Sequence, residues 1–137
     1  MEKITLTKPD DWHLHLRGGS AMKSVVGMSA LQMGRGVIMP NLSPPIKNVS
    51  QAKAYRKEIM SALPIETTFN PLMVLYLTDS TTKNEIIEAS EAQEVHAVKF
   101  YPAGATTNSD SGVTNLSSTY PALEQMQKEG VPLLIHG

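Results

Sequence analysis

Segments with the pattern of β-strands alternate with segments with the pattern of α-helices along the whole sequence. The strand-like segments occur at residues 12–16, 37–39, within 68–77, 97–100 and 132–135. The helix-like segments lie between them, at residues 21–33, 50–63, from 82 onward and 118–129. Regular alternation of strand and helix predicts a parallel sheet whose strands are joined by right-handed helical crossovers.

Local sequence signals mark where these helices begin and end. Gly34 follows the first helical segment and Gly130 the last, and glycine is typical of the position just after a helix. Ser50 is a candidate N-cap for the second helix. Thr82 and Glu85 have the spacing of a capping box at the start of the third. These signals support four separate helices.

Two α/β architectures are compatible with this alternation. An open, doubly wound sheet of five strands fits 137 residues, whereas a (β/α)8 TIM barrel takes about 250 residues. Barrels build their sites from the ends of several strands, and here a polar residue follows every strand. No glycine-rich phosphate loop follows the first strand. These observations favour the parallel barrel, of which residues 1–137 would supply about five of the eight strands and four helices.

Charge and composition exclude several classes of partner. A net charge of −1 gives no electrostatic basis for binding nucleic acid or a membrane surface. No signal-peptide pattern is present, and no apolar run approaches the roughly 20 residues that cross a bilayer. We expect a soluble, cytoplasmic protein. Because the sequence has no cysteine, any metal must be held by nitrogen and oxygen ligands.

A pair of histidines near the start of the chain could form part of a metal site. His13 and His15 are two residues apart in a strand-like segment, so both imidazoles project from one face if the segment is extended. Trp12, Leu14 and Leu16 would then project from the other face. Two histidines can also simply occupy a partly buried strand, so the rest of the chain must decide between these interpretations.

Lys99 is an unusual residue for its position. Val98 and Phe100 share one face of a short apolar strand, so the side chain of Lys99 must share the other face with Ala97. An unpaired ammonium in a sheet interior is costly. Such a lysine reaches solvent, pairs with a carboxylate, or reacts as the neutral amine with carbon dioxide to form a carbamate, an anion whose oxygens can bridge two cations.

Two further features belong to the same end of the predicted sheet. His136 follows the last strand, so its ring can reach the region of His13 and His15. Several hard or borderline ligands at strand ends are typical of hydrolytic sites with two metal ions. The polar loop at residues 102–113 is long enough to act as a lid, although a surface excursion is the alternative.

Five motifs together resemble a known family. They are DDWHLHLR at residues 10–17, MPNL at 39–42, KFYP at 99–102, ATTN at 105–108 and LIHG at 134–137. The chain resembles the dihydroorotases of the amidohydrolase superfamily, in their short bacterial homodimeric form. The HxH pattern alone would indicate only the superfamily, whereas the five motifs in this order are much more specific.

The resemblance implies roles for the metal-binding residues. His13, His15 and Lys99, as carboxylysine, would ligate the more buried of two zinc ions. Lys99 and His136 would ligate the second, so the carboxylated lysine would bridge the two metals.

The resemblance also implies how the substrate is held. Arg17 and Asn41 match the positions that bind the substrate α-carboxylate, and a guanidinium suits a carboxylate well. Thr106 and Thr107 match a mobile loop that closes over the substrate. Without the resemblance, Arg17 would be a solvated loop charge and Asn41 a turn residue.

In the family the barrel continues after His136, so the resemblance implies that residues 1–137 are the N-terminal part of a single metal-dependent hydrolase barrel domain. The remaining part of that barrel normally brings another histidine ligand and the aspartate that moves the proton. The general base is therefore expected beyond Gly137, and residues 1–137 alone are expected to be inactive. A homodimer is expected for the intact protein.

The implied activity is the zinc-dependent, reversible cyclisation of N-carbamoyl-L-aspartate to L-dihydroorotate in pyrimidine biosynthesis. The alternatives are another cyclic-amide hydrolase, such as a hydantoinase or allantoinase, and a non-catalytic barrel fragment. Arg17 and Asn41 favour the first activity, since they imply a substrate carboxylate.

Overall fold

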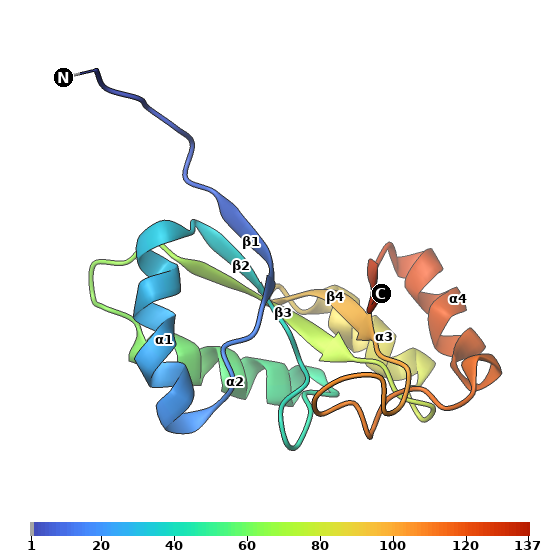
Figure 1. Ribbon diagram of the computed structural model, residues 1–137. Coiled ribbons are helices and arrows are strands. Elements are labelled where there is room, and N and C mark those ends of the chain that lie inside the picture. Colours follow the sequence, from blue (N-terminus) through green and yellow to red (C-terminus); the bar gives the residue numbers. More distant parts are fainter. Residues whose placement is uncertain (1) are drawn as a thin grey trace.

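The computed structural model describes residues 2–137, which form five strands, four α-helices and one short 3₁₀ helix (Figure 1). Their bounds are β1 Asp10–Leu14, α1 Gly19–Gln32, β2 Arg35–Ile38, α2 Val49–Ala62, β3 Asn70–Tyr76, α3 Lys83–Glu91, β4 Val95–Phe100, η1 Leu116–Thr119, α4 Tyr120–Glu129 and β5 Leu133–Ile135. The predicted alternation of strands and helices is therefore confirmed.

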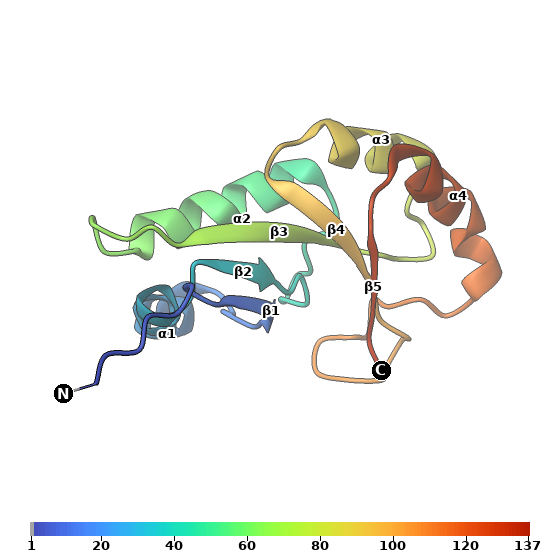
Figure 2. The ribbon, with the colours of Figure 1, turned by 90° about the horizontal axis from the view of Figure 1, so that it is seen from above.

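The five strands form one parallel sheet in the order β1-β2-β3-β4-β5. Each new strand is added on the same side of the previous one, whereas a doubly wound sheet reverses its strand order at a switch point. Figure 2 shows that the strand direction turns steadily from β1 to β5, so that the sheet curls. This topology is that of a partial barrel, as predicted.

All four helices cover the same face of the sheet, which we call the outer face. Buried side chains from every helix join one hydrophobic cluster with outward-facing strand residues such as Ile38, Leu75 and Val98. The opposite, inner face carries a smaller apolar cluster, formed by Val37, Met39, Leu72, Val74, Ala97 and Leu134. A doubly wound fold has helices on both faces of its sheet, so this one-sided arrangement also indicates a barrel.

Helix α3 begins as its sequence predicts. The Thr82 side chain accepts a hydrogen bond from the Glu85 backbone, and the Glu85 side chain accepts one from the Thr82 backbone. The N-cap of α2 is different from the one predicted. Asn48, not Ser50, occupies that position, and its side chain accepts a hydrogen bond from Gln51 N. Both residue types are good caps, so their chemistry alone could not distinguish between them.

Of the three residues predicted to share a face, Leu14 and Leu16 join the helix-covered core but Trp12 does not. Leu16 is fully buried under the helices and Leu14 packs against the same cluster, whereas the Trp12 side chain is 66% exposed. The pairing of β1 with β2 shifts register between Asp11 and Leu14. An irregularity of this kind breaks the strict alternation of side chains from which the prediction was made.

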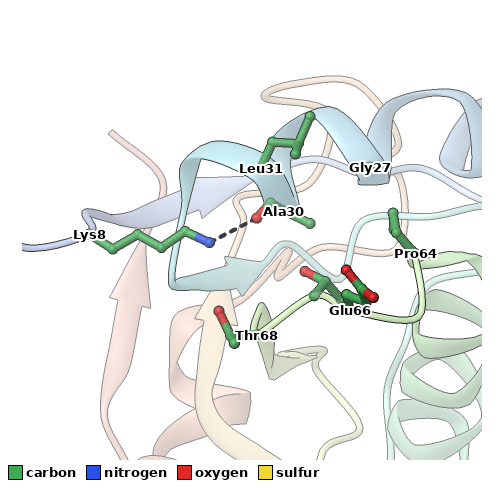
Figure 3. A pocket seen from close by; sticks show the side chains of 8 residues that line it. Lys8, Gly27, Ala30, Leu31, Pro64, Glu66 and Thr68 are labelled. Atoms are coloured by element: carbon green, nitrogen blue, oxygen red, sulfur yellow. Dashed lines mark hydrogen bonds between the residues drawn. The ribbon is translucent and has the colours of Figure 1, made fainter.

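A shallow pocket of about 360 Å³ lies at the opposite end of the sheet from the predicted site (Figure 3). Residues of α1 and of the segment before β3 line it, together with Lys8. The Lys8 ammonium donates a hydrogen bond to the Ala30 carbonyl oxygen in the last turn of α1, at 3.0 Å. A cation at the end of a helix stabilises it, so this contact is explained structurally.

Within residues 2–137, no helix combines the length and the hydropathy needed to cross a membrane.

Gly36 gives a test of how tightly β1 and β2 are packed. A Cβ at Gly36 would lie 2.8 Å from the buried Phe69 ring and 3.0 Å from Leu14, on the strand that carries His13. We expect Gly36→Ala to lower the free energy of unfolding by about 1–3 kcal/mol because the core must shift. The control is Gly27→Ala in α1, where the new methyl would meet no atom within 4 Å.

Gly27→Ala should instead raise stability, by up to about 1 kcal/mol, because alanine favours the helix. Chemical denaturation of both variants of the intact protein measures the difference. Equal stability of the two variants would show that Phe69 and Leu14 can move aside for the added methyl group without cost.

Candidate metal and substrate site

Polar and aromatic side chains gather at the carboxyl end of the inner face, directly beyond its apolar cluster. Tyr76 of β3 is paired with Lys99 of β4. This pair lies two residues after the pair Val74 and Ala97, so all four side chains belong to the inner face. The group as a whole contains His13, His15, Asn41, Tyr76, Lys99, Tyr101 and His136. The curl of the sheet brings residues from its first and last strands into one place.

His13 and His15 converge as the HxH pattern predicts. Their Nε2 atoms are 3.1 Å apart and their ring centroids 5.0 Å apart. Burial lowers the pKa of both imidazoles, and the neighbouring Lys99 and His136 charges lower the pKa of His13 further. Neutral imidazoles have a free nitrogen lone pair, so the pair presents two donor atoms to one point.

Lys99 is almost completely buried, with 3% of its surface exposed. Its Nζ donates a hydrogen bond to the Ile135 carbonyl oxygen at 3.1 Å and lies 5.5 Å from the centre of the Tyr101 ring. None of the ion pairs in residues 2–137 involves this ammonium. Burial lowers the pKa of Lys99, which favours the neutral, nucleophilic amine.

His136 lies beside Lys99, just beyond β5. Its backbone N–H donates to the Phe100 carbonyl oxygen at 3.1 Å, and its ring lies 5.6 Å from the Tyr101 ring. The structure therefore places three predicted histidines and Lys99 at one end of the inner face.

The donor set at this end of the sheet fits a metal ion only in part. Among residues 2–137, no group of three or more His, Cys, Asp or Glu side chains could hold a metal. The two converging imidazoles of His13 and His15 nevertheless have the chemistry and spacing of two ligands to one ion. Lys99 is a further candidate donor at the same end of the sheet, so these residues fit one side of a metal site rather than a complete one.

The backbone at Arg17 has the left-handed conformation, with φ of 63°. This conformation is unfavourable for a residue with a side chain. The buried Tyr55 hydroxyl of α2 donates a hydrogen bond to the Arg17 carbonyl oxygen and holds this turn in place. The Arg17 charge also lowers the pKa of His15.

Asn41 is buried, and both ends of its amide are used. Its Oδ1 accepts a hydrogen bond from the Tyr101 hydroxyl at 3.2 Å, and its Nδ2 donates to the Thr107 carbonyl oxygen at 2.9 Å. Thr106 is half-buried and Thr107 exposed, in a loop that folds over this end of the sheet. Of the predicted substrate residues, Asn41 and Thr107 are therefore in direct contact.

Tyr76 and Tyr101 were not predicted as part of the site. Their rings stack, with centroids 5.1 Å apart, and burial raises the pKa of each hydroxyl to about 12. Tyr101 comes two residues after Lys99 and therefore points to the same side of the chain. That spacing was the signal in the sequence that could have identified it.

The sequence matches no family model, but it is similar to many curated proteins. It is 58% identical over 136 residues to a dihydroorotase of Cupriavidus necator, covering 99% of this chain and 40% of the relative. It is 54% identical to a dihydroorotase of Pseudomonas paraeruginosa, with coverages of 99% and 39%. The chain thus spans about two fifths of the length of these relatives.

Solved structures show the same relationship. A dihydroorotase from Campylobacter jejuni superposes with a TM-score of 0.87 at 38% identity, covering 95% of this chain and 38% of that one. A dihydroorotase from Saccharomyces cerevisiae in complex with 5-fluoroorotic acid gives 0.85 at 35% identity, with coverages of 94% and 35%. An L-hydantoinase from Arthrobacter aurescens gives 0.70 at 11% identity, covering 94% and 29%, and shows the fold alone.

The curled sheet, the one-sided helices and these neighbours define the chain as part of a parallel (β/α)8 barrel. Within that class it corresponds to the N-terminal portion of a protein of the dihydroorotase family. The resemblance inferred from the five sequence motifs is confirmed. The roles of individual site residues stay predictions.

Proposed function

We propose that the intact protein catalyses the reversible cyclisation of N-carbamoyl-L-aspartate to L-dihydroorotate, a step of pyrimidine biosynthesis. The observation that carries the proposal is the converging pair His13 and His15 with buried Lys99 at the same end of the inner face, in a chain 58% identical to a dihydroorotase. We further propose two zinc ions per site, a cytoplasmic location and a homodimer, as the family resemblance implies.

We assign the metal-holding role to four residues. His13 and His15 would hold the first zinc ion together with Lys99, and Lys99 and His136 would hold the second. Zinc bound there would supply Lewis-acid chemistry, polarising the ring carbonyl and activating water for attack. The neutral state that burial favours in His13 and His15 keeps their ring nitrogens available as donors.

Lys99 would act after carboxylation. The neutral amine adds through its nitrogen to the carbon of carbon dioxide and releases a proton, so that a cation site becomes an anionic carboxylate. The burial of Lys99 supports this step because it removes the solvation that stabilises an ammonium. The product has two oxygens, which suits a ligand shared between two cations.

Arg17 and Asn41 would bind the substrate carboxylate. The guanidinium can donate two parallel hydrogen bonds to one carboxylate. Asn41 Nδ2 carries two N–H groups, of which one is used by Thr107, and the other would bind the substrate. Thr106 and Thr107 would contact the substrate from the loop. The proton would be moved by the aspartate that the resemblance places beyond Gly137.

The test of the function is direct. The intact protein, purified with its metal, should interconvert L-dihydroorotate and N-carbamoyl-L-aspartate, and elemental analysis should find zinc. Hydantoin and allantoin, which lack a carboxylate at the matching position, are the comparison substrates. Faster turnover of either one would favour the alternative cyclic-amide hydrolases.

Lys99→Ala in the intact protein is expected to abolish turnover and lower zinc content, since it removes a ligand to both ions. A short carboxylic acid added to this variant should restore part of both, because it can fill the vacated space and supply oxygens. The control is Lys128→Ala, an exposed lysine of α4. Full zinc content and normal turnover in Lys99→Ala would contradict the bridging role.

Arg17→Met should separate substrate binding from metal binding. Zinc content should stay at the wild-type level, while KM rises by about 10- to 100-fold, because charge-assisted hydrogen bonds to the carboxylate are lost. Steady-state kinetics with metal analysis measures both quantities. Loss of zinc with unchanged KM would place Arg17 in a structural role instead.

Residues 1–137 expressed alone should show negligible turnover even with added zinc. Removing members of a catalytic unit typically lowers the rate by several orders of magnitude. The same assay applied to the intact protein is the control. Turnover by residues 1–137 near that of the intact protein would show that the remaining part of the barrel is dispensable.

A further inference from the structure

Two loops that are far apart in the sequence hold each other by a reciprocal pair of hydrogen bonds. Asn41, after β2, donates from its side chain to the Thr107 carbonyl oxygen at 2.9 Å. Asn108, after β4, donates from its side chain to the Asn41 carbonyl oxygen at 3.1 Å. Each asparagine therefore binds the backbone of the other loop, across 66 and 67 residues of sequence.

The backbone of Asn108 is also held in place. Its φ is +54°, in the left-handed region, which asparagine tolerates better than most residues with a side chain. Its carbonyl oxygen accepts a hydrogen bond from the Tyr76 hydroxyl at 3.3 Å. Asn108 thus forms the turn, donates from its side chain to Asn41 and accepts at its carbonyl oxygen from Tyr76.

The residues that bind Asn108 are buried and are held in place by residues of the sheet. Asn41 is only 2% exposed, and its Oδ1 accepts a hydrogen bond from Tyr101. Tyr101 stacks on Tyr76, so the two hydroxyls that support the loops come from one buried aromatic pair. The four residues form a continuous chain of contacts from β3 and β4 to both loops.

We propose that Asn108 is a positioning residue that latches the loop at residues 102–113 over the site and ties its placement to Asn41. Thr106 and Thr107 directly precede Asn108, so the latch sets where they lie relative to Asn41. The proposal rests on the proposed function, because it gives the latched loop and Asn41 a shared substrate. The latch itself is a structural feature that can be measured without turnover.

The experiment compares the intact, metal-loaded protein with its Asn108→Gly variant. Glycine adopts the same φ without strain, so the substitution removes the side-chain donor without straining the turn, although it also adds backbone freedom that the Tyr76→Phe variant below does not. Hydrogen–deuterium exchange of the peptide that spans 102–113 should become faster. KM for L-dihydroorotate should rise by about 3- to 10-fold, the effect of one neutral hydrogen bond, while zinc content is unchanged.

Two further variants sharpen the test. Tyr76→Phe keeps the ring stack but removes the hydroxyl that binds the Asn108 carbonyl, so it should also speed exchange in the loop. Ser111→Ala is the matched control, because Ser111 is an exposed residue of the same loop outside the latch. It should leave both exchange and KM at wild-type values.

Unchanged exchange of the 102–113 peptide in Asn108→Gly would overturn the latch, whatever the activity. Faster exchange with an unchanged KM would overturn the positioning role. If the intact protein failed to turn over L-dihydroorotate at all, the proposed function would fall, whereas the exchange measurement would still decide whether the latch exists.

Discussion

The site depends on one constraint, the alternation of side chains along parallel strands that helices cover on a single face. Outward residues such as Leu75 and Val98 are buried beneath the helices, so the residues between them must face the inside of the curl. At mid-strand those inward residues are apolar, as Val74 and Ala97 are. Lys99 comes two residues after Ala97, so the same alternation directs its side chain inward. Its burial therefore follows from its position in the strand and not from a preference of lysine for the interior.

The curl of the sheet brings residues that are far apart in the sequence close together in space. His13 belongs to the first strand of the sheet and His136 follows the last, yet the charge of His136 lowers the pKa of His13. In a flat sheet these positions would be separated by the width of three intervening strands, at nearly 5 Å per step. A metal site assembled from both strands therefore requires the barrel curvature, which the helices on the outer face maintain.

The sequence predicts features that arise locally or from strict periodicity, and it fails where tertiary contacts decide. Alternation gave the order of the elements and the inward direction of Lys99, and the capping box at Thr82 was visible because both partners are three residues apart. The face of Trp12 could not be predicted, because the register shift in β1 arises from its pairing with β2. Likewise, the contact between Asn108 and Asn41 could not be predicted, because no sequence pattern relates residues so far apart.

The electrostatics of the site give the proposed carboxylation of Lys99 a physical rationale. The described residues bring the Lys99 amine, two imidazoles and Arg17 together, and the interactions that shift the pKa values of His13 and His15 are mainly burial and repulsion between cations. Such a cluster disfavours every additional positive charge, metal ions included. Converting Lys99 into an anion reverses the sign of its contribution at the centre of the cluster. The same burial that makes the ammonium unfavourable thus favours the chemistry that would prepare the site for two cations.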